Sequence, residues 1–237
     1  MQQCIDVHLI RVFEGPRHET LYKLWDTVAE FYAEEIRVIW FANPECRLEH
    51  ADCLNRIWVE SQDRDSTRMI ITEADFLPNL SNTDRWLQAP LDDKRSIAFA
   101  GAMYANREAG TRAVRHFSGL PAAWFLSFAK ERCPKILDFR GPPDPATRLP
   151  DQFEDGQGAR LYKGLDEYPR FLSLTYPFGT HLFWSRHLND DPTLRVSGFS
   201  CHEIQTKHDR RVRKWLLDQP KAFRKLVEDR HGSILLG

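Results

Sequence analysis

Residues 69–78 read Met-Ile-Ile-Thr-Glu-Ala-Asp-Phe-Leu-Pro, and this stretch decides the fold that we predict. Its first residues form a short apolar run, which is typical of a strand buried inside a sheet. Glu73 and Asp75 follow directly and are one residue apart, so both carboxylates are expected to point to the same side. Because charges beside a core are unfavourable unless something pairs with them, the two residues predict a bound cation. Capping of the following turn is the alternative interpretation.

Two strand-and-helix pairs precede this stretch. We predict strands at 5–13 and 36–41 and helices at 18–32 and 48–61, with the strand at 36–41 buried on both faces. Such an alternation of strands and helices predicts a parallel sheet with right-handed crossovers. Ligands of these sheets bind at the carboxyl ends of the strands, which is where residues 73–78 are expected to lie.

The second half of the chain has a less regular pattern. Strands are expected at 95–104, 159–162 and 171–175, a helix or strand-helix unit at 120–132, a proline-rich loop or lid at 138–151, and a mostly helical tail at 207–230 that Pro220 interrupts. No internal repeat and no linker requires a second domain. A single α/β domain is therefore predicted over 1–237.

The composition is that of a globular protein. The chain has 237 residues, 42% of them hydrophobic, and a net charge of -1, which gives no overall attraction to nucleic acid or membranes. Its five cysteines show no Cys-x-x-Cys spacing, which favours reduced thiols. The N-terminus lacks the apolar core of a signal peptide, and no apolar run approaches the roughly 18 residues of a membrane span. A cytoplasmic location is expected.

The carboxylate pair suits a hard divalent ion. Mg²⁺ and Mn²⁺ prefer oxygen ligands and are commonly held by one or two carboxylates together with substrate phosphates. An ion held by Glu73 and Asp75 would offset the charge of a leaving diphosphate, so that the bond between carbon and oxygen breaks more easily. The pair therefore indicates chemistry on a diphosphate compound.

Residues 48–55, Leu-Glu-His-Ala-Asp-Cys-Leu-Asn, together with 69–78 resemble the GT-A-fold glycosyltransferases, in particular the family-2-like nucleotide-diphospho-sugar transferases. In that family a helix with a small-x-x-x-Asn pattern precedes a strand that ends in Asp-x-Asp and a proline. The resemblance implies a Rossmann-like GT-A fold, with a mainly parallel sheet flanked by helices and a C-terminal helical tail. It further implies that Asp75 binds Mn²⁺ or Mg²⁺, and that Glu73, in place of the usual first Asp, lies near the metal or the ribose.

The resemblance also divides the domain. It implies a nucleotide-binding half at 1–104, an acceptor-binding half at 105–206 and a C-terminal helix at 207–237. In the family, the first strand and the loop after the second strand hold the nucleotide. Arg11, Glu14 and Asn43 lie at these positions, and Asn55 and Glu73 belong to the matching helix and strand end. Arg186 is a further candidate that would neutralise the diphosphate, with a surface ion pair as the alternative.

Later motifs are implied to complete the site. Gly119 and Trp124 resemble the family's acceptor segment, although Trp124 also suits a core. Glu154 and Asp155 resemble its x-Glu-Asp motif, in which the Asp is the base for the acceptor hydroxyl; a solvated helix end explains them equally well. His181 has the place in chain order of a third metal ligand, with His187 as the competing candidate and a structural role as the alternative.

Three functions are therefore compared. The first is a metal-dependent glycosyltransferase that uses a nucleotide-diphosphate sugar as donor. The second is a nucleotidyltransferase, against which the loop at 14–18 has only one glycine. The third is a non-catalytic nucleic-acid-binding protein. Its candidate phosphate contacts are the basic run at 207–214, with Arg210, Arg211, Arg213 and Lys214, and also Arg107, Arg112 and Arg115; a solvated basic helix face is the alternative interpretation of the run. The first and third combine in a glycosyltransferase that acts on a modified DNA base such as 5-hydroxymethylcytosine.

Overall fold

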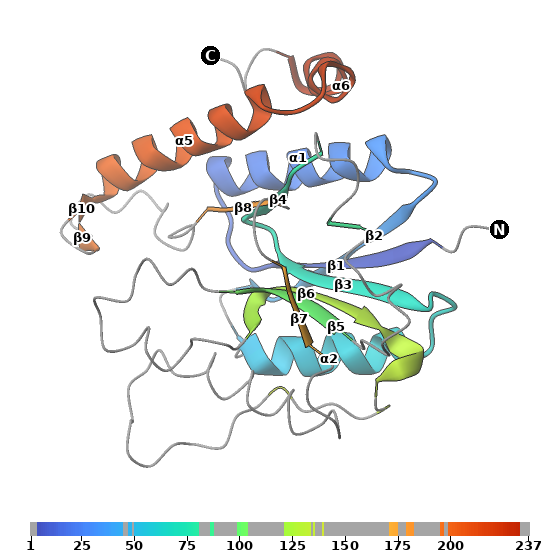
Figure 1. The fold of residues 1–237 in the computed structure, drawn as a ribbon. Helices are drawn as coiled ribbons and strands as arrows, with labels where there is room; N and C mark the ends of the chain where they lie inside the picture. The colour runs from blue at the N-terminus through green and yellow to red at the C-terminus, as the bar shows by residue number, and fades with distance from the viewer. Residues whose placement is uncertain are drawn as a thin grey trace.

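A six-stranded sheet lies at the centre of the protein, with the strand order β2-β1-β3-β6-β5-β7 (Figure 1). This computed structural model describes residues 4–44, 47–48, 50–80, 86–87, 99–103, 121–133, 135, 139, 171–174, 179–182, 195–196 and 199–232. The strands β1 (Ile5–Arg11), β2 (Ile36–Ala42) and β3 (Arg68–Glu73) pair in parallel, as predicted.

The other half of the sheet is mixed. The strand β6 (Pro121–Ala129) pairs antiparallel with β3 and with β5 (Phe99–Met103), and β7 (Phe171–Leu174) pairs parallel with β5. The strands predicted at 95–104 and 171–175 are thus confirmed as β5 and β7. A mainly parallel sheet flanked by helices, the predicted α/β class, is what the chain forms.

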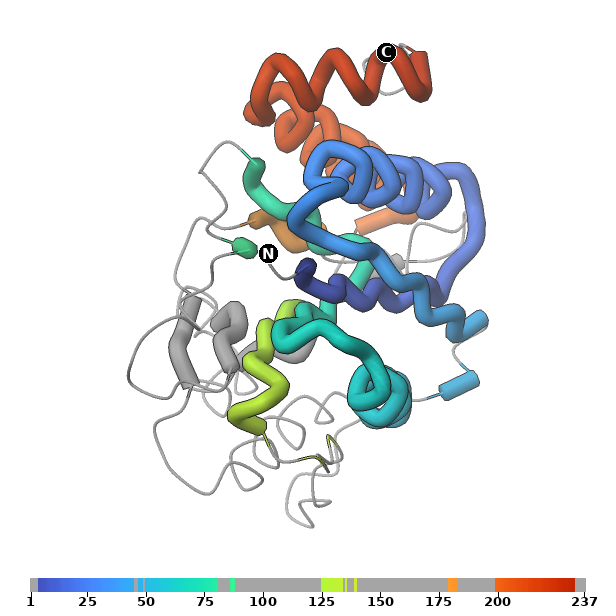
Figure 2. The backbone as a smooth tube through the Cα atoms, turned by 90° about the vertical axis from the view of Figure 1, so that its right-hand side faces the viewer, coloured from blue at the N-terminus to red at the C-terminus, as the bar shows by residue number. Residues whose placement is uncertain are grey.

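Helices cover both faces of the sheet (Figures 1 and 2). The helix α1 (Pro16–Phe31) lies on one face, and α2 (His50–Gln62) lies on the other. Beyond α1 lie α5 (Cys201–Leu217) and α6 (Lys221–His231), and the rings of Phe31 and Phe223 join α1 to α6 with centroids 5.5 Å apart. The C-terminal tail therefore forms a further layer on the α1 side.

Alternate side chains of β3 enter two separate cores. Ile70 belongs to the larger core, between the sheet and α1, α5 and α6, whereas Met69 and Ile71 belong to the core between the sheet and α2. Trp25 lies in the first core and Trp58 in the second, each with no exposed surface. The apolar run that opens residues 69–78 is thus buried on both faces, as expected of a central strand.

The strand β2 departs from its prediction. Ile36 is the one buried residue of β2, and every later residue of the strand is partly or fully exposed. The expectation of burial on both faces is therefore wrong. The cause is position, because among the strands that the structure describes β2 has β1 as its one neighbour and lies at the edge of the sheet. Its apolar side chains are half-buried: Val38 and Trp40 pack against the core under α1, and Phe41 against the core under α2.

The C-terminal tail consists of α5 and α6, with Pro220 between them as predicted. The helix α5 begins at Cys201 rather than at Lys207, because Ser200 and Glu203 form a capping box. The Glu203 backbone N–H donates to Ser200 Oγ at 3.3 Å, and the Ser200 backbone N–H donates to Glu203 Oε2 at 2.8 Å. The helical tail is therefore longer than the sequence pattern indicates.

The remaining described elements are short. The described residues of the segment predicted at 120–132 form the strand β6 followed by a 3-10 helix, η3 (Lys130–Arg132). The smaller strands are β4 (Phe76–Pro78), β8 (Gly179–His181), β9 (Arg195–Val196) and β10 (Phe199–Ser200). The strand predicted at 159–162 and, apart from Phe139, the loop predicted at 138–151 lie outside the described residues.

A buried histidine in β1 is expected to make the stability of the fold depend on pH. His8 is 2% exposed, and burial lowers its pKa from 6.5 to about 4. Between these pH values the unfolded chain binds a proton at His8 that the folded chain does not bind. The contribution of neutral His8 to stability is therefore complete above pH 6.5 and is lost as the pH falls toward 4. We expect this to lower the free energy of unfolding by up to about 3 kcal/mol over that interval.

Urea unfolding at pH 7 and at pH 4.5 measures the effect. His8→Gln removes the titrating group and should flatten the pH dependence, whereas His202→Gln, at an exposed position of α5, should leave it unchanged. Equal slopes for His8→Gln and the wild type would contradict the assignment.

Candidate metal centre

Three strands end at one edge of the sheet. The register pairs Arg11 of β1 with Ala42 of β2, and Ile10 of β1 with Glu73 of β3. Parallel pairing thus brings the ends of β1, β2 and β3 together, which is the edge where α/β sheets bind ligands. The Asn43 backbone N–H donates to Arg11 O at 2.8 Å and continues this edge by one residue.

The chain turns directly after Glu73 and leaves the central sheet. Ala74 and Asp75 form a turn, and β4 then pairs antiparallel with β8, so that Phe76 lies opposite His181. The backbone N–H of Leu182 donates to Asp75 O at 2.9 Å. This pairing brings His181, which is distant in sequence, to the two carboxylates.

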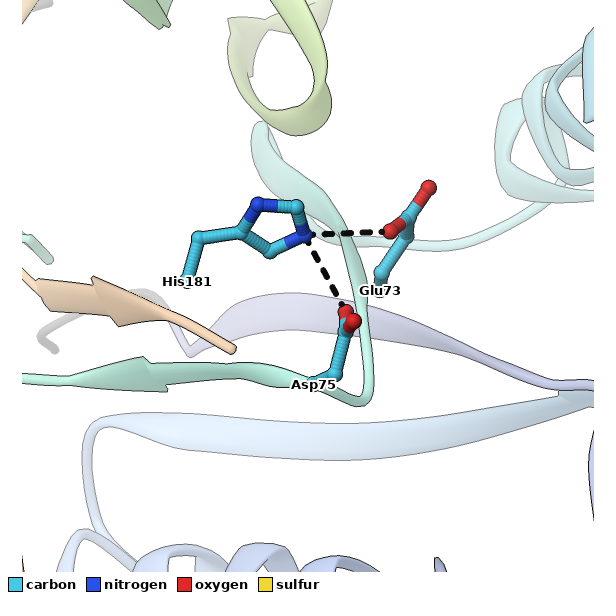
Figure 3. A group of neighbouring side chains, drawn as sticks. All are labelled: Glu73, Asp75 and His181. Atoms are coloured by element: carbon cyan, nitrogen blue, oxygen red, sulfur yellow. Dashed lines mark hydrogen bonds and ion pairs between the residues drawn. The ribbon is translucent and has the colours of Figure 1, made fainter. Parts of the chain in front are cut away.

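The three side chains converge on one point (Figure 3). His181 Nε2 lies 3.4 Å from Glu73 Oε2 and 3.3 Å from Asp75 Oδ1. One ligand atom from each of Glu73, Asp75 and His181 lies within 4.8 Å of the other two. The structure thus brings together the three residues that the sequence and the resemblance indicated as metal ligands.

The electrostatics of this cluster favour a positive charge. The side chains of Asp75 and His181 are 9% and 11% exposed, and that of Glu73 is 31% exposed. Burial by itself would lower the pKa of His181, but Asp75 and then Glu73 outweigh it and raise the pKa to about 10. Carboxylates suit Mn²⁺ and Mg²⁺, and an imidazole beside them is a reasonable third ligand for Mn²⁺. The donor set therefore fits a divalent metal.

Trp25 of α1 holds the turn that carries Asp75. Its indole N–H donates to Ala74 O at 3.1 Å and to Phe76 O at 3.0 Å, the carbonyl groups on either side of Asp75. The ring has no exposed surface. The helical spacing of 18–32 places Trp25 in the core, but no pattern in the sequence shows the direction of its N–H, so this role was missed.

The pairing of β4 with β8 depends on close packing. A side-chain carbon at Gly179 would lie 2.1 Å from the ring of Phe76, so only glycine lets β8 approach β4 this closely. Farther along, Trp215 of α5 donates its indole N–H to Pro78 O at 2.8 Å, and the Leu80 backbone N–H donates to Gln219 Oε1 at 2.8 Å. The C-terminal helices therefore support the strand that follows Asp75.

Two residues implied as nucleotide contacts lie at or beyond the end of β1. Arg11 forms an ion pair with Glu19 at 2.6 Å, and its guanidinium lies 4.5 Å from the centre of the Tyr22 ring. Glu14 is exposed in the loop that joins β1 to α1. Arg11 and Glu14 remain predictions as nucleotide contacts, because their positions at the ligand edge agree with that role without testing it.

Two further residues hold local structure. The buried Asn43 donates through Nδ2 to Leu48 O at 2.8 Å and accepts at Oδ1 from the Leu48 backbone N–H at 2.9 Å. Asn55 accepts at Oδ1 from the backbone N–H of Phe139 at 2.8 Å. The observed role of both side chains is to fix loops at α2, and nucleotide contact remains a prediction for both.

The remaining predicted site residues are not placed. Gly119, Glu154, Asp155, Arg186 and His187 lie outside the described residues, and of Trp124 only the backbone, in β6, is described. None of the helices in the described part of the chain is long and apolar enough to span a membrane.

No protein-family model matches the sequence, and no curated protein matches it. A mannosyltransferase from Pyrobaculum calidifontis, solved with GDP-Man and Mn²⁺, is 10% identical, with a TM-score of 0.43 over 98% of this chain and 70% of that one. Glucosyl-3-phosphoglycerate synthase from Mycobacterium tuberculosis, solved with Mn²⁺ and UDP, is 13% identical, with a TM-score of 0.45 over 93% and 82%. A glycosyltransferase involved in glycosylation of the major capsid of PBCV-1 is 13% identical, with a TM-score of 0.36. The match covers 54% of this chain and 60% of that glycosyltransferase.

Proposed function

We propose that the protein is a metal-dependent glycosyltransferase that moves a sugar from a nucleotide-diphosphate sugar to an acceptor hydroxyl. The observation that carries this proposal is the convergence of Glu73, Asp75 and His181 at the carboxyl edge of a parallel sheet. A cluster of that kind at that edge suits a chelated diphosphate, because metal and phosphate charges are neutralised together there.

The three side chains would have distinct tasks. Asp75 and His181 are nearly buried and would hold the metal from the protein side, whereas Glu73 is more exposed to solvent. A bound Mn²⁺ or Mg²⁺ would supply the positive charge that stabilises the departing diphosphate. Trp25 and the β4–β8 pairing fix the turn, so the ligand oxygens need little rearrangement on binding.

The proposed reaction exchanges one bond for another at the sugar. The bond between the anomeric carbon and the diphosphate oxygen breaks, and the acceptor hydroxyl oxygen bonds to that carbon. The hydroxyl proton passes to a base, and Asp155 is our candidate from the sequence.

The acceptor is proposed only as a compound with a free hydroxyl group. An acceptor on DNA has support from three exposed arginines of α5, Arg210, Arg211 and Arg213. Acidic neighbours offset part of the basic charge in this region, because Asp209 pairs with Arg17 at 3.0 Å and Asp218 with Lys214 at 2.6 Å. A hydroxylated DNA base therefore remains one acceptor class within the proposal.

A thermal-shift panel tests the function. Nucleoside diphosphates of each base are added with Mn²⁺ and with EDTA, and we expect one base to raise the melting temperature in the presence of Mn²⁺ only. A ligand at one hundred times its Kd stabilises the folded state by about 2.7 kcal/mol. The nucleotide sugar of that base is then tested for hydrolysis or transfer. Undiminished turnover after thorough chelation would overturn the metal-dependent mechanism.

A further inference from the structure

The carboxylate of Glu73 lies between two imidazole rings. Its Oε2 is 3.4 Å from Nε2 of His181, and its Oε1 is 3.5 Å from Nε2 of His50. His50 is the first residue of α2, so it reaches the carboxyl edge from the face of the sheet opposite α1. Each oxygen of the one carboxylate thus faces a different histidine.

His50 is outside the candidate ligand set. Within the described part of the chain, Glu73, Asp75 and His181 are the group whose ligand atoms lie within 4.8 Å of one another, and His50 does not belong to it. Its contact in the cluster is with the oxygen of Glu73 that faces away from His181. Its position is that of an outer partner to a ligand, and such partners orient ligating carboxylates.

Nε2 of His50 is a buried polar atom for which Glu73 Oε1 is the nearby partner. Nε2 is enclosed and makes no hydrogen bond to the residues that the structure describes, although a quarter of the side chain is exposed. A buried polar atom without a hydrogen bond is unfavourable. The separation of 3.5 Å from Glu73 Oε1 exceeds an ordinary N–H···O distance, and a shift of about 0.5 Å would close it.

We propose that His50 is a positioning residue whose Nε2–H holds Oε1 of Glu73, so that Oε2 stays directed at Asp75 and His181. This inference rests on the proposed metal-dependent function. Glu73 is the most exposed of the three ligands, and without a partner its long side chain is free to turn toward solvent. Loss of such an outer hydrogen bond lowers metal affinity by about 10-fold to 100-fold.

Mn²⁺ titration of the full-length protein, followed by the electron paramagnetic resonance signal of free Mn²⁺, tests the proposal without an activity assay. His50→Phe keeps the ring bulk and removes the donor, and we expect it to raise the Kd for Mn²⁺ by about 10-fold or more. His50→Gln retains an N–H donor and should restore most of the affinity. His202→Phe, at an exposed position on α5, is the matched control.

The outcomes separate the two proposals. If the wild type binds neither Mn²⁺ nor Mg²⁺, both the metal function and the role of His50 are overturned. If the wild type binds Mn²⁺ and His50→Phe binds it equally well, only the role of His50 is overturned. The same conclusion follows if His50→Gln binds Mn²⁺ as weakly as His50→Phe does. His50→Ala repeats the test if the phenylalanine variant does not fold, and melting curves without metal identify that case.

Discussion

Asp75→Asn is expected to abolish metal-dependent transfer, with turnover lowered by about a thousandfold, or about 4 kcal/mol of transition-state stabilisation. Asp75 is the most buried of the three candidate ligands, and its Oδ1 lies 3.3 Å from His181 Nε2. Asparagine has nearly the same shape, so the variant removes the negative charge while the turn at 74–75 keeps its backbone contacts with Trp25 and Leu182.

Mn²⁺ titration and an assay of nucleotide-sugar hydrolysis measure this effect. Asp218→Asn is the matched control, because Asp218 is an exposed aspartate that pairs with Lys214 at the end of α5. The control should retain wild-type affinity and turnover. Wild-type affinity for Mn²⁺ in Asp75→Asn would remove Asp75 from the metal site, and with it the main support for the enzymatic function.

The order of strands and helices could be predicted because local patterns determine it. The apolar run of residues 69–72 and the helical spacing of Trp25 are both visible in the sequence and both buried in the structure. The position of β2 could not be predicted in this way, because its apolar residues resemble those of a central strand. Whether a strand has one neighbour or two depends on the pairing of the whole sheet, and β2 pairs with β1 alone among the described strands.

The candidate site was predictable only in part, because some of its residues are brought together by pairing between distant segments. The spacing of Glu73 and Asp75 is local, so the sequence indicates that both carboxylates face one side. The approach of His181 depends on the β4–β8 pairing, and the resemblance rather than any spacing pointed to it. His50 could be seen at the start of a predicted helix, but only the packing of α2 against the sheet brings it to Glu73.

The second large effect is expected at Trp25. Trp25→Ala should lower the free energy of unfolding by about 3–5 kcal/mol, because the ring is fully buried and packs against Trp86 with centroids 6.1 Å apart. Trp25→Phe retains most of the apolar volume but removes the N–H that donates to the carbonyl groups of Ala74 and Phe76. For this variant we expect a smaller loss of about 1–3 kcal/mol.

The informative comparison is between stability and metal affinity in Trp25→Phe. If the indole N–H holds the turn, this variant should weaken Mn²⁺ binding at a temperature where the protein is still fully folded by urea titration. Trp40→Phe is the matched control, because the N–H of Trp40 donates to the exposed side chain of Asp26 at 3.2 Å and not to the turn that carries Asp75. If the two variants weaken Mn²⁺ binding equally, the contact of Trp25 with the turn does not position Asp75, and the burial of its ring is its whole contribution.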